Sequence, residues 1–197
     1  MIRPRPGAIR AILAAGFLLA AFFLFKAAWI PAKAALGQQL LNQAWQKVLA
    51  GNSQARPWPW ADTSPVAVLE VPQLGVRQLV LSGASGRNLA WGPVWQSPGS
   101  AEHANDVILS GHRDTHFRFL KDLKAGDELV LGSRHGARHY RVQYQEIINA
   151  DQTEMLIEPG LDRLTLVTCY PFDALQAGGP LRYVVTAVPV SSFIDNG

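Results

Sequence analysis

The sequence predicts an all-β domain, in the form of a closed or nearly closed β-barrel, preceded by helical segments. Short β-branched runs recur from Val66 onward, and Gly or Pro residues separate them. The runs expected as strands are residues 66–71, 76–81, 106–110, 127–131, 139–148, 164–168 and 182–188. Seven or eight short strands with one clear internal helix, residues 117–123, favour a barrel. A parallel α/β sheet is not expected, because strands and helices do not alternate and no glycine-rich phosphate loop occurs.

An apolar segment near the N-terminus predicts a membrane-spanning helix. Residues 8–30 carry charge only near the two ends, at Arg10 and Lys26, and the segment is long enough to cross a bilayer. The arginines before it orient the N-terminus to the cytoplasm and the rest of the chain to the other side. A cleavable signal peptide is the alternative, since residues 32–34 have the small-x-small form of a cleavage site. In either case the larger part of the protein works outside the cytoplasm.

Residues 33–50 form a predicted amphipathic helix, because Leu41, Trp45, Val48 and other apolar residues recur at helical spacing. This helix either holds the domain away from the membrane or packs against the domain, and packing is the simpler expectation. A linker rich in Pro and Trp follows as far as Pro65 and is too proline-broken for a helix or a central strand. The predicted organisation is a basic tip and anchor in residues 1–32, a helix and linker in 33–65, and a barrel domain in 66–197.

The charge of the chain does not point to a nucleic-acid partner. The net charge is +3, and charged residues make up 17% of the sequence. Arg3, Arg5 and Arg10 alone equal this excess, so the remaining chain is close to neutral. No basic stripe with interleaved aromatic residues occurs. We therefore expect contact with a membrane through the N-terminal segment and no binding of nucleic acid.

Cys169 is the only cysteine, and it ends a predicted strand. A free cysteine is most often a small buried hydrophobic residue. Two features oppose that interpretation here. An unpaired thiol is a liability outside the cytoplasm, and the end of a strand is a common place for a functional site. A reactive thiol needs a nearby base or cation to form the thiolate, and residues near other strand ends are the candidates for these groups.

His112 is the candidate base, because it also follows a predicted strand and Gly111 before it permits close approach of another segment. His135 and His139 lie in a polar, arginine-rich turn and are expected at the surface. His112 and His116 have the spacing of a helical metal pair, but no further ligands accompany them, so no metal site is predicted there.

Arg182 is the candidate cation. It lies in the predicted strand that follows Cys169, and an exposed strand charge is the alternative interpretation. If the intervening loop returns the chain as an adjacent strand, Arg182 lies beside Cys169. There its planar guanidinium could donate hydrogen bonds to an oxyanion or a substrate carbonyl.

These residues resemble those of the sortase family. Residues 165–169 (TLVTC) are similar to the family's TLxTC strand, residues 109–113 (LSGHR) are similar to its GHR segment, and residues 181–183 (LRY) are similar to its arginine strand. Residues 68–72 and 123–127 also fit the family's first strand and its L-x-x-G-D turn. The similarity covers residues 66–189 in the family's order. The N-terminal anchor and the WPWADT run before the first strand are most similar to the proteobacterial branch.

The resemblance implies an eight-stranded sortase barrel with one or two short helices, and a membrane-anchored cysteine transpeptidase without a cofactor. Cys169 would attack the Thr–Gly bond of an LPxTG-like sorting signal on an exported protein and form a thioacyl-enzyme. His112 would protonate the leaving amine and then deprotonate the incoming one. Arg182 would hold the substrate and stabilise the oxyanion. The residues expected to support substrate binding or the oxyanion are Thr168, Ser110 and Leu109.

Two departures limit what the resemblance implies. The linker before the first strand lacks the Asp-Pro-aromatic lid of pilin-polymerising sortases, which favours a housekeeping or single-substrate role. Some family members bind calcium near a loop that corresponds to residues 149–163. The carboxylates of this segment fit a solvated turn equally well, so no metal is predicted; they are Asp151, Glu154, Glu158 and Asp162.

Two other functions are compatible with the same sequence. A cysteine peptidase would use the same residues and pass the acyl group to water instead of an amine. A membrane-tethered barrel that acts as a non-catalytic binding module would not need Cys169 or His112. The transpeptidase is favoured over the binding module because three residues with distinct chemical roles occur in the family's order.

Overall fold

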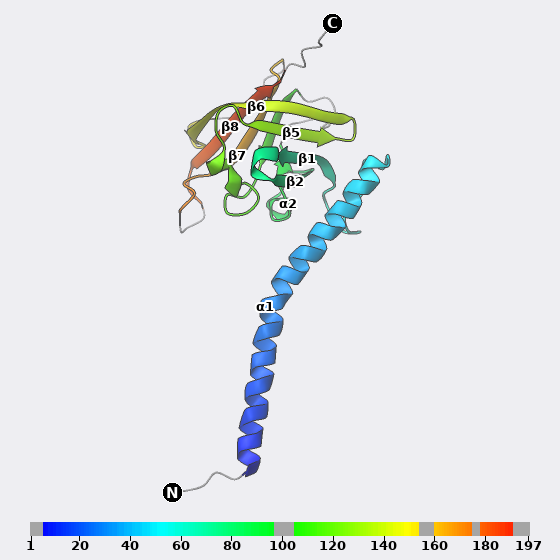
Figure 1. Cartoon of the computed structure of the whole chain (residues 1–197), viewed down its shortest axis with the longest axis vertical. Coiled ribbons are helices and arrows are strands. Elements are labelled where there is room, and N and C mark those ends of the chain that lie inside the picture. The colour runs from blue at the N-terminus through cyan, green and yellow to red at the C-terminus, as the bar shows by residue number, and fades with distance from the viewer. Residues whose placement is uncertain (1–5, 97–104, 154–159, 175–177, 191–197) are drawn as a thin grey trace. The chain divides into compact units, whose positions relative to one another are not determined.

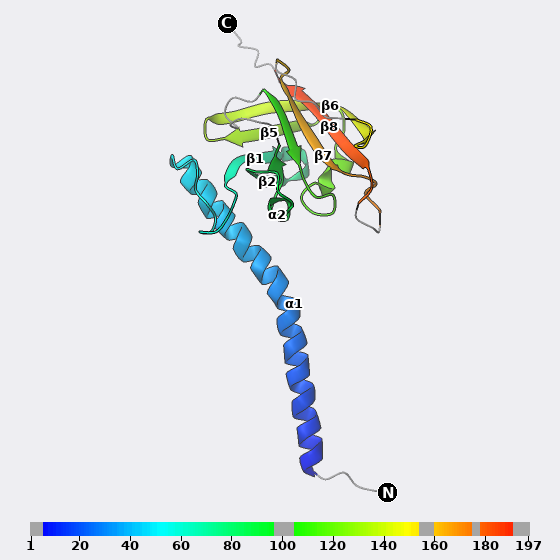
Figure 2. The same ribbon diagram turned by 180° about the vertical axis from the view of Figure 1, so that it is seen from behind.

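The computed structural model describes residues 6–96, 105–153, 160–174 and 178–190 (Figure 1 and, from behind, Figure 2). The chain divides into two compact units, Met1–Gln39 and Leu40–Gly197. Helix α1, Pro6–Leu49, begins in the first unit, and its last turns belong to the second. The two helical segments that the sequence predicts therefore form one continuous helix, with Pro31 inside it.

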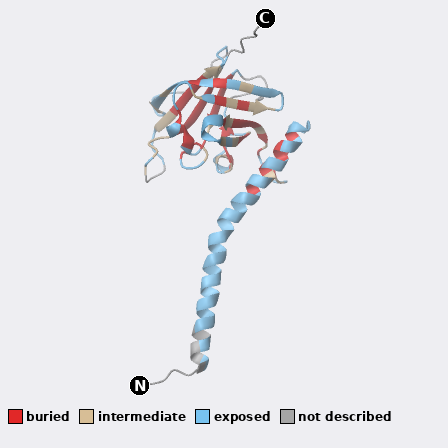
Figure 3. Cartoon of the chain, viewed as in Figure 1, coloured by how far each residue is buried: buried red, intermediate tan, exposed pale blue. Residues whose placement is uncertain are grey.

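The first unit consists of the apolar part of α1. The segment Leu13–Leu49 contains a stretch that is long and apolar enough to cross a membrane, by length and composition. Large apolar side chains along it are exposed, among them Phe17, Phe22 and Ile30. Figure 3 shows this part of the helix in pale blue. A helix that is apolar on all sides is suited to an apolar surrounding instead of water.

The last turns of α1 pack within the second unit, as the amphipathic pattern predicts. Leu41, Ala44, Trp45 and Val48 are buried, and their spacing places them on one face of the helix. They form an apolar cluster with residues of the linker and of neighbouring strands, namely Ala55, Val68, Leu79, Leu81 and Val94. The end of α1 is therefore part of the folded domain.

The second unit contains a closed barrel of eight strands in the order β1-β2-β3-β4-β7-β8-β6-β5. The strands are β1 Pro65–Val71, β2 Val76–Leu81, β3 Val94–Trp95, β4 Asp106–Ser110, β5 Glu128–Ser133, β6 Gly136–Asn149, β7 Arg163–Cys169 and β8 Leu181–Pro189. The short helices of the described part are η1 Pro72–Leu74, α2 Gly86–Leu89 and η2 Arg118–Asp122. The eight-stranded barrel confirms the predicted fold class.

The main differences between the predicted and observed elements are at β3, at the short helices and at the turn between β5 and β6. Strand β3 was not among the predicted runs, because two residues are too few to produce an alternating pattern. Helix α2 is a single turn and was also not predicted. Strand β6 begins at Gly136 instead of 139, because its pairing with β5 continues to Ser133 opposite Gly136. The turn between these strands is therefore shorter than the polar segment that the sequence suggested.

The interior of the barrel is apolar, and strand alternation determines which residues face it. In β7, Leu164 and Leu166 are fully buried and belong to the main core cluster, with Leu109 of β4 and Val185 of β8. The alternate residues on these strands face outward and form a separate small cluster, Ile108, Val167 and Val184. The wall formed by β4, β7 and β8 therefore has an apolar inner face and a partly apolar outer face.

Strands β4, β7 and β8 are neighbours in the barrel, although they lie far apart in the sequence. β4 pairs with β7 in parallel, from Asp106 opposite Arg163 to Ser110 opposite Val167. β7 pairs with β8 in antiparallel fashion. The ends of β4 and β7 and the start of β8 consequently lie at one edge of the barrel.

Leu41→Ala is expected to destabilise the second unit, because the side chain is fully buried in the apolar cluster that the last turns of α1 form with β1, β2 and β3. We expect the free energy of unfolding to fall by about 2–5 kcal/mol. Chemical denaturation of the full chain in detergent, followed by near-UV circular dichroism, measures it. Leu49→Ala is the matched control, because Leu49 is 48% exposed, and its effect should stay within about 0.5 kcal/mol. Equal effects of the two substitutions would contradict the packing of α1 on the domain.

Candidate active site

The structure brings Cys169, His112 and Arg182 to the same edge of the barrel. The last register pair of the parallel ladder is Ser110 opposite Val167, and the Gly111 amide donates to the Val167 carbonyl at 3.1 Å. His112 and Cys169 each follow this pair by two residues, on neighbouring strands. Cys169 is also the register partner of Arg182 on β8. The predicted nucleophile thus lies between the predicted base on one side and the predicted cation on the other.

Cys169 faces outward from the barrel wall. Thr168 before it is 2% exposed and points inward with Leu166, so alternation turns Cys169 toward the outer face. Arg182 shares this face because it is directly opposite Cys169 in the ladder. Cys169 and Arg182 are half-buried and His112 is exposed, so all three can be reached from outside.

A side-chain hydrogen bond from Thr168 connects the end of β7 to Gly111, the residue before His112. Its Oγ1 donates to the Gly111 carbonyl at 2.8 Å, and this hydrogen bond is buried. The hydroxyl proton is therefore directed to the backbone of the His112 segment, which favours a role for Thr168 in positioning over direct donation to an oxyanion.

The other two supporting candidates lie on opposite faces of β4. Ser110 is half-buried and shares the outer face with Val167. Leu109 is fully buried in the core cluster inside the barrel. Its side chain packs in the barrel interior and does not reach the outer face, where a substrate would lie.

Gly111 is required by close packing and not by an unusual backbone conformation. A Cβ at this position would lie 2.6 Å from Cγ of Phe117. Phe117 is itself fully buried, and its amide donates to the His112 carbonyl at 3.0 Å. The ring thus packs directly on the chain beside His112 and fixes the turn that carries it.

Arg182 is held by its own loop. Its Nη1 donates to the carbonyl oxygens of Gly179 at 2.7 Å and Leu181 at 2.9 Å. These bonds fix the guanidinium at the start of β8, on the face that it shares with Cys169.

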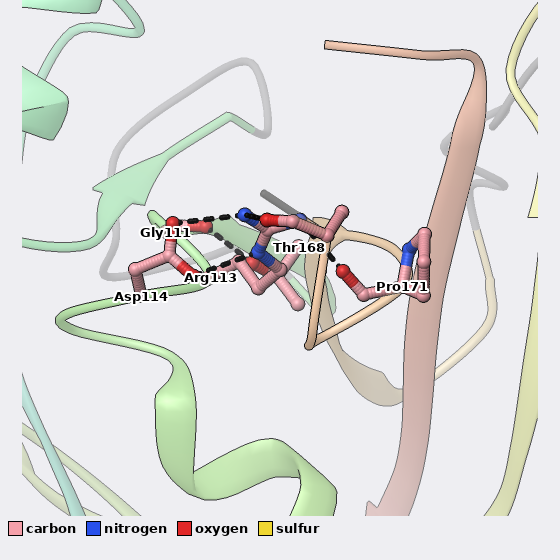
Figure 4. Close-up of polar contacts among 6 residues, drawn as sticks. Gly111, Arg113, Asp114, Thr168 and Pro171 are labelled. Carbon is pink, nitrogen blue, oxygen red and sulfur yellow. Dashed lines mark hydrogen bonds and ion pairs between the residues drawn. The ribbon is translucent and has the colours of Figure 1, made fainter. Parts of the chain in front are cut away.

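Arg113 and Asp114 were not predicted as site residues, and the structure places them beside the site. The Arg113 guanidinium is 7% exposed and donates to both carboxylate oxygens of Asp114, at 2.8 and 3.0 Å. It also donates to two backbone carbonyls after β7, Pro171 at 2.6 Å and Ala174 at 3.0 Å (Figure 4). The hydrogen bonds from Arg113 lower the pKa of Asp114, and the same bonds raise the pKa of Arg113. The sequence showed only an Arg-Asp dipeptide, which carries no signal of burial.

The remaining described histidines have structural partners. His135 accepts from Arg134 Nε at 2.8 Å, and His139 Nδ1 lies 2.6 Å from Glu128. Both are exposed, which confirms the predicted surface positions. His116 is half-buried, with its ring nitrogens near Gln78 Oε1 at 3.2 Å and the Ala90 carbonyl at 3.4 Å. It therefore faces β2 and α2.

Within the described ranges, no group of three or more His, Cys, Asp or Glu residues lies close enough to hold a metal ion. Asp162 pairs with Arg138. Two of the carboxylates considered from the sequence, Glu154 and Glu158, lie outside the described residues.

Comparison with known proteins identifies the family. A family model described as "Sortase domain" matches residues 69–190, which is more than half of the chain. The chain belongs to the sortase family. Sortases are cysteine transpeptidases that act on exported proteins with LPxTG-type sorting signals. The match includes the strands that carry the candidate site.

Individual relatives and structures agree with this family. Sortase D of Bacillus subtilis (strain 168) is 29% identical over 120 residues, and Sortase A of Bacillus anthracis is 24% identical over 105 residues. These matches cover 60% and 51% of this chain, and the chain spans 60% and 50% of the length of these curated relatives.

Solved sortases share the fold. Sortase C-1 from Actinomyces oris has a TM-score of 0.56 at 27% identity, covering 66% of this chain and 76% of that one. Sortase A from Corynebacterium diphtheriae, in a lid mutant, has a TM-score of 0.58 at 19% identity and shows the fold alone; the match covers 84% of this chain and 98% of that one.

Gly111→Ala is expected to destabilise this sortase, because the new methyl group would overlap the Phe117 ring. We expect a loss of about 1–3 kcal/mol in the free energy of unfolding. Gly132→Ala is the matched control, since its Cβ would meet only the Val68 carbonyl oxygen, at an ordinary 3.8 Å. Denaturant titration of the two variants measures the difference, and an equal loss in both would contradict the steric explanation.

His116 is expected to make stability depend on pH. Burial lowers the pKa of His116 below its ordinary value of 6.5. The unfolded chain therefore binds more protons near and below pH 6.5, so the free energy of unfolding falls as the pH is lowered through this region. His116→Gln should remove this contribution and leave a weaker dependence. Denaturation of both proteins between neutral pH and pH 5 tests the prediction, and identical pH profiles would contradict it.

Proposed function

We propose that this chain is a membrane-anchored sortase that cleaves an LPxTG-like sorting signal of an exported protein and transfers the acyl group to an amine. The observation that carries the proposal is the position of Cys169. It lies in register with Arg182 on β8 and at the same strand end as His112, within the segment that matches the sortase domain.

In the first step, the Cys169 thiolate attacks the carbonyl carbon of the Thr–Gly bond. The Sγ–C bond forms, the C–N bond of the peptide breaks, and His112 donates a proton to the leaving glycine amine. The product is a thioester between Cys169 and the threonine of the sorting signal.

In the second step, an acceptor amine attacks the thioester carbon. A new amide bond forms, the Sγ–C bond breaks, and His112 takes the proton that the amine loses. The thiolate is regenerated, so the cycle consumes no oxidant, reductant or cofactor. Arg182 stabilises the oxyanion of both tetrahedral intermediates, because a planar guanidinium offers several donors in fixed geometry.

The sorting signal would reach Cys169 from the outer face of β4, β7 and β8. Ile108, Val167 and Val184 form an apolar cluster on this face, but they are only 4–6% exposed, so they pack beneath the site and do not offer a binding surface. Ser110, Cys169 and Arg182 are half-buried on the same face. We assign contact with the signal to these three accessible residues.

Helix α1 supports anchoring in the cytoplasmic membrane by a single span. Arginines precede the apolar segment, so the N-terminus remains in the cytoplasm and the barrel faces the periplasm or the cell exterior. The linker before β1 has no Asp-Pro-aromatic lid, which favours a housekeeping or single-substrate role. The WPWADT run favours the proteobacterial branch of the family.

The decisive test incubates the full chain in detergent with a labelled LPxTG peptide, with and without an added amine. Mass spectrometry should detect a thioester on Cys169 and an amide product that depends on the amine. Cys169→Ala should abolish both products. His112→Ala should lower the acylation rate by about 10²–10⁴-fold, and His116→Ala should have a much smaller effect, because His116 faces β2 and α2.

Several outcomes would contradict the proposal. Release of the hydrolysed peptide with every amine tried would indicate a cysteine peptidase. Full activity of Cys169→Ala would exclude the thioester route. An equal loss in His116→Ala and His112→Ala would show that the base is assigned to the wrong histidine. Arg182→Lys should also be strongly impaired, because a single ammonium cannot reproduce the guanidinium fork.

A further inference from the structure

Among the described residues beside the site, Arg113 is a buried charged side chain that the proposed mechanism leaves without a role. It follows His112 directly, and it is 7% exposed. A charged group is costly to bury unless it is paired and hydrogen-bonded. Arg113 meets this requirement with one carboxylate and two backbone carbonyls, so its position is strongly defined.

The partners of Arg113 come from two different segments. Asp114, 67% exposed, lies on the same turn and receives both parallel hydrogen bonds of the guanidinium fork. Pro171 and Ala174 lie in the loop that leaves β7. Asp114 therefore orients the guanidinium, and the guanidinium holds the loop against the His112 turn (Figure 4).

Two hydrogen bonds hold the backbone on either side of Cys169. Before it, Thr168 donates to the Gly111 carbonyl, and after it, Arg113 donates to the Pro171 carbonyl. Gly111 and Arg113 are the two neighbours of His112 in the chain. The residues on either side of His112 thus hold the backbone on either side of Cys169.

We propose that Arg113, oriented by Asp114, is a positioning residue that fixes Cys169 relative to His112. This inference rests on the proposed function, because it concerns the geometry of the same two side chains. The group does not touch the substrate; it acts through the backbone of both reactive residues. Proton transfer between two groups is sensitive to such geometry, and a displacement of about 1 Å can lower a rate about 100-fold.

Electrostatics support the pairing of Arg113 with Asp114. The pKa of Arg113 is raised chiefly by its hydrogen bond with Asp114, and the pKa of Asp114 is lowered chiefly by the same bond. The ion pair therefore favours the charged form of both groups, which keeps the guanidinium oriented toward the loop after β7.

Arg113→Lys tests the positioning role, because lysine keeps the charge and loses the planar fork. In the peptide assay we expect kcat of acylation to fall about 100-fold while KM stays within about threefold. A residue that only stabilises the fold would leave kcat unchanged at temperatures where the variant is folded.

Arg163→Lys is the matched control. Arg163 donates to both carboxylate oxygens of Asp106 at 2.8 and 3.0 Å, at the opposite end of the same pair of strands. The substitution removes the same kind of fork without touching the Cys169 edge. The free energy of unfolding of Arg163→Lys should fall about as much as that of Arg113→Lys, whereas its kcat should stay within about threefold of wild type. The proposal is wrong if Arg113→Lys has wild-type kcat, or if both variants lose activity equally.

Two further measurements keep the test decisive. If Arg113→Lys does not fold, Asp114→Asn replaces it; this exposed position retains one acceptor for the guanidinium, and we expect a fall in kcat of about tenfold. If the wild-type protein does not acylate, the proposed function fails. Alkylation of Cys169 by iodoacetamide then tests Arg113 alone, since it needs no peptide. Its pH-dependent rate should change in Arg113→Lys and not in Arg163→Lys, and unchanged rates in both would overturn the inference.

Discussion

Strands β4 and β7 run side by side in parallel, and an arginine–aspartate pair lies near each end of their ladder. Asp106 and Arg163 face each other at the start, and Arg113 with Asp114 attaches the turn after β4 to the loop after β7. Parallel neighbours end at the same edge of a sheet. This pairing is the reason that Cys169 and His112, the proposed nucleophile and base, come from distant parts of the sequence to the same edge, and the antiparallel pairing of β7 with β8 adds Arg182 to them.

The barrel supports this edge from the inside. Leu109 and Leu166 pack in the interior, and the Phe117 ring lies directly against Gly111. Close packing leaves little freedom for the backbone, because interiors have the density of organic crystals. The outer face of the same strands carries Cys169 and Arg182, the proposed nucleophile and cation. One wall thus has an apolar inner face that packs in the core and an outer face that holds the candidate site.

The two described arginines of this site, Arg182 and Arg113, each have defined hydrogen-bond acceptors. Arg182 is held by two carbonyls of its own loop, and Arg113 by a carboxylate and two carbonyls of another loop. A guanidinium can satisfy several acceptors in one plane, whereas an ammonium cannot. Arginine side chains therefore hold described residues on both flanks of the segment between β7 and β8, next to the proposed nucleophile.

The sequence by itself determined the all-β class, most strand positions and the apolar N-terminal helix, and it indicated Cys169, His112 and Arg182 as the candidate site residues. Alternation and strand-end positions are local properties, so they can be read from the chain directly. The two-residue β3 and the burial of Arg113 were decided only by the tertiary structure. A strand of two residues has no period, and an Arg-Asp pair has the same composition whether it is exposed or enclosed. What surrounds Arg113 is the loop after β7, and only the parallel pairing of β4 with β7 brings that loop to it.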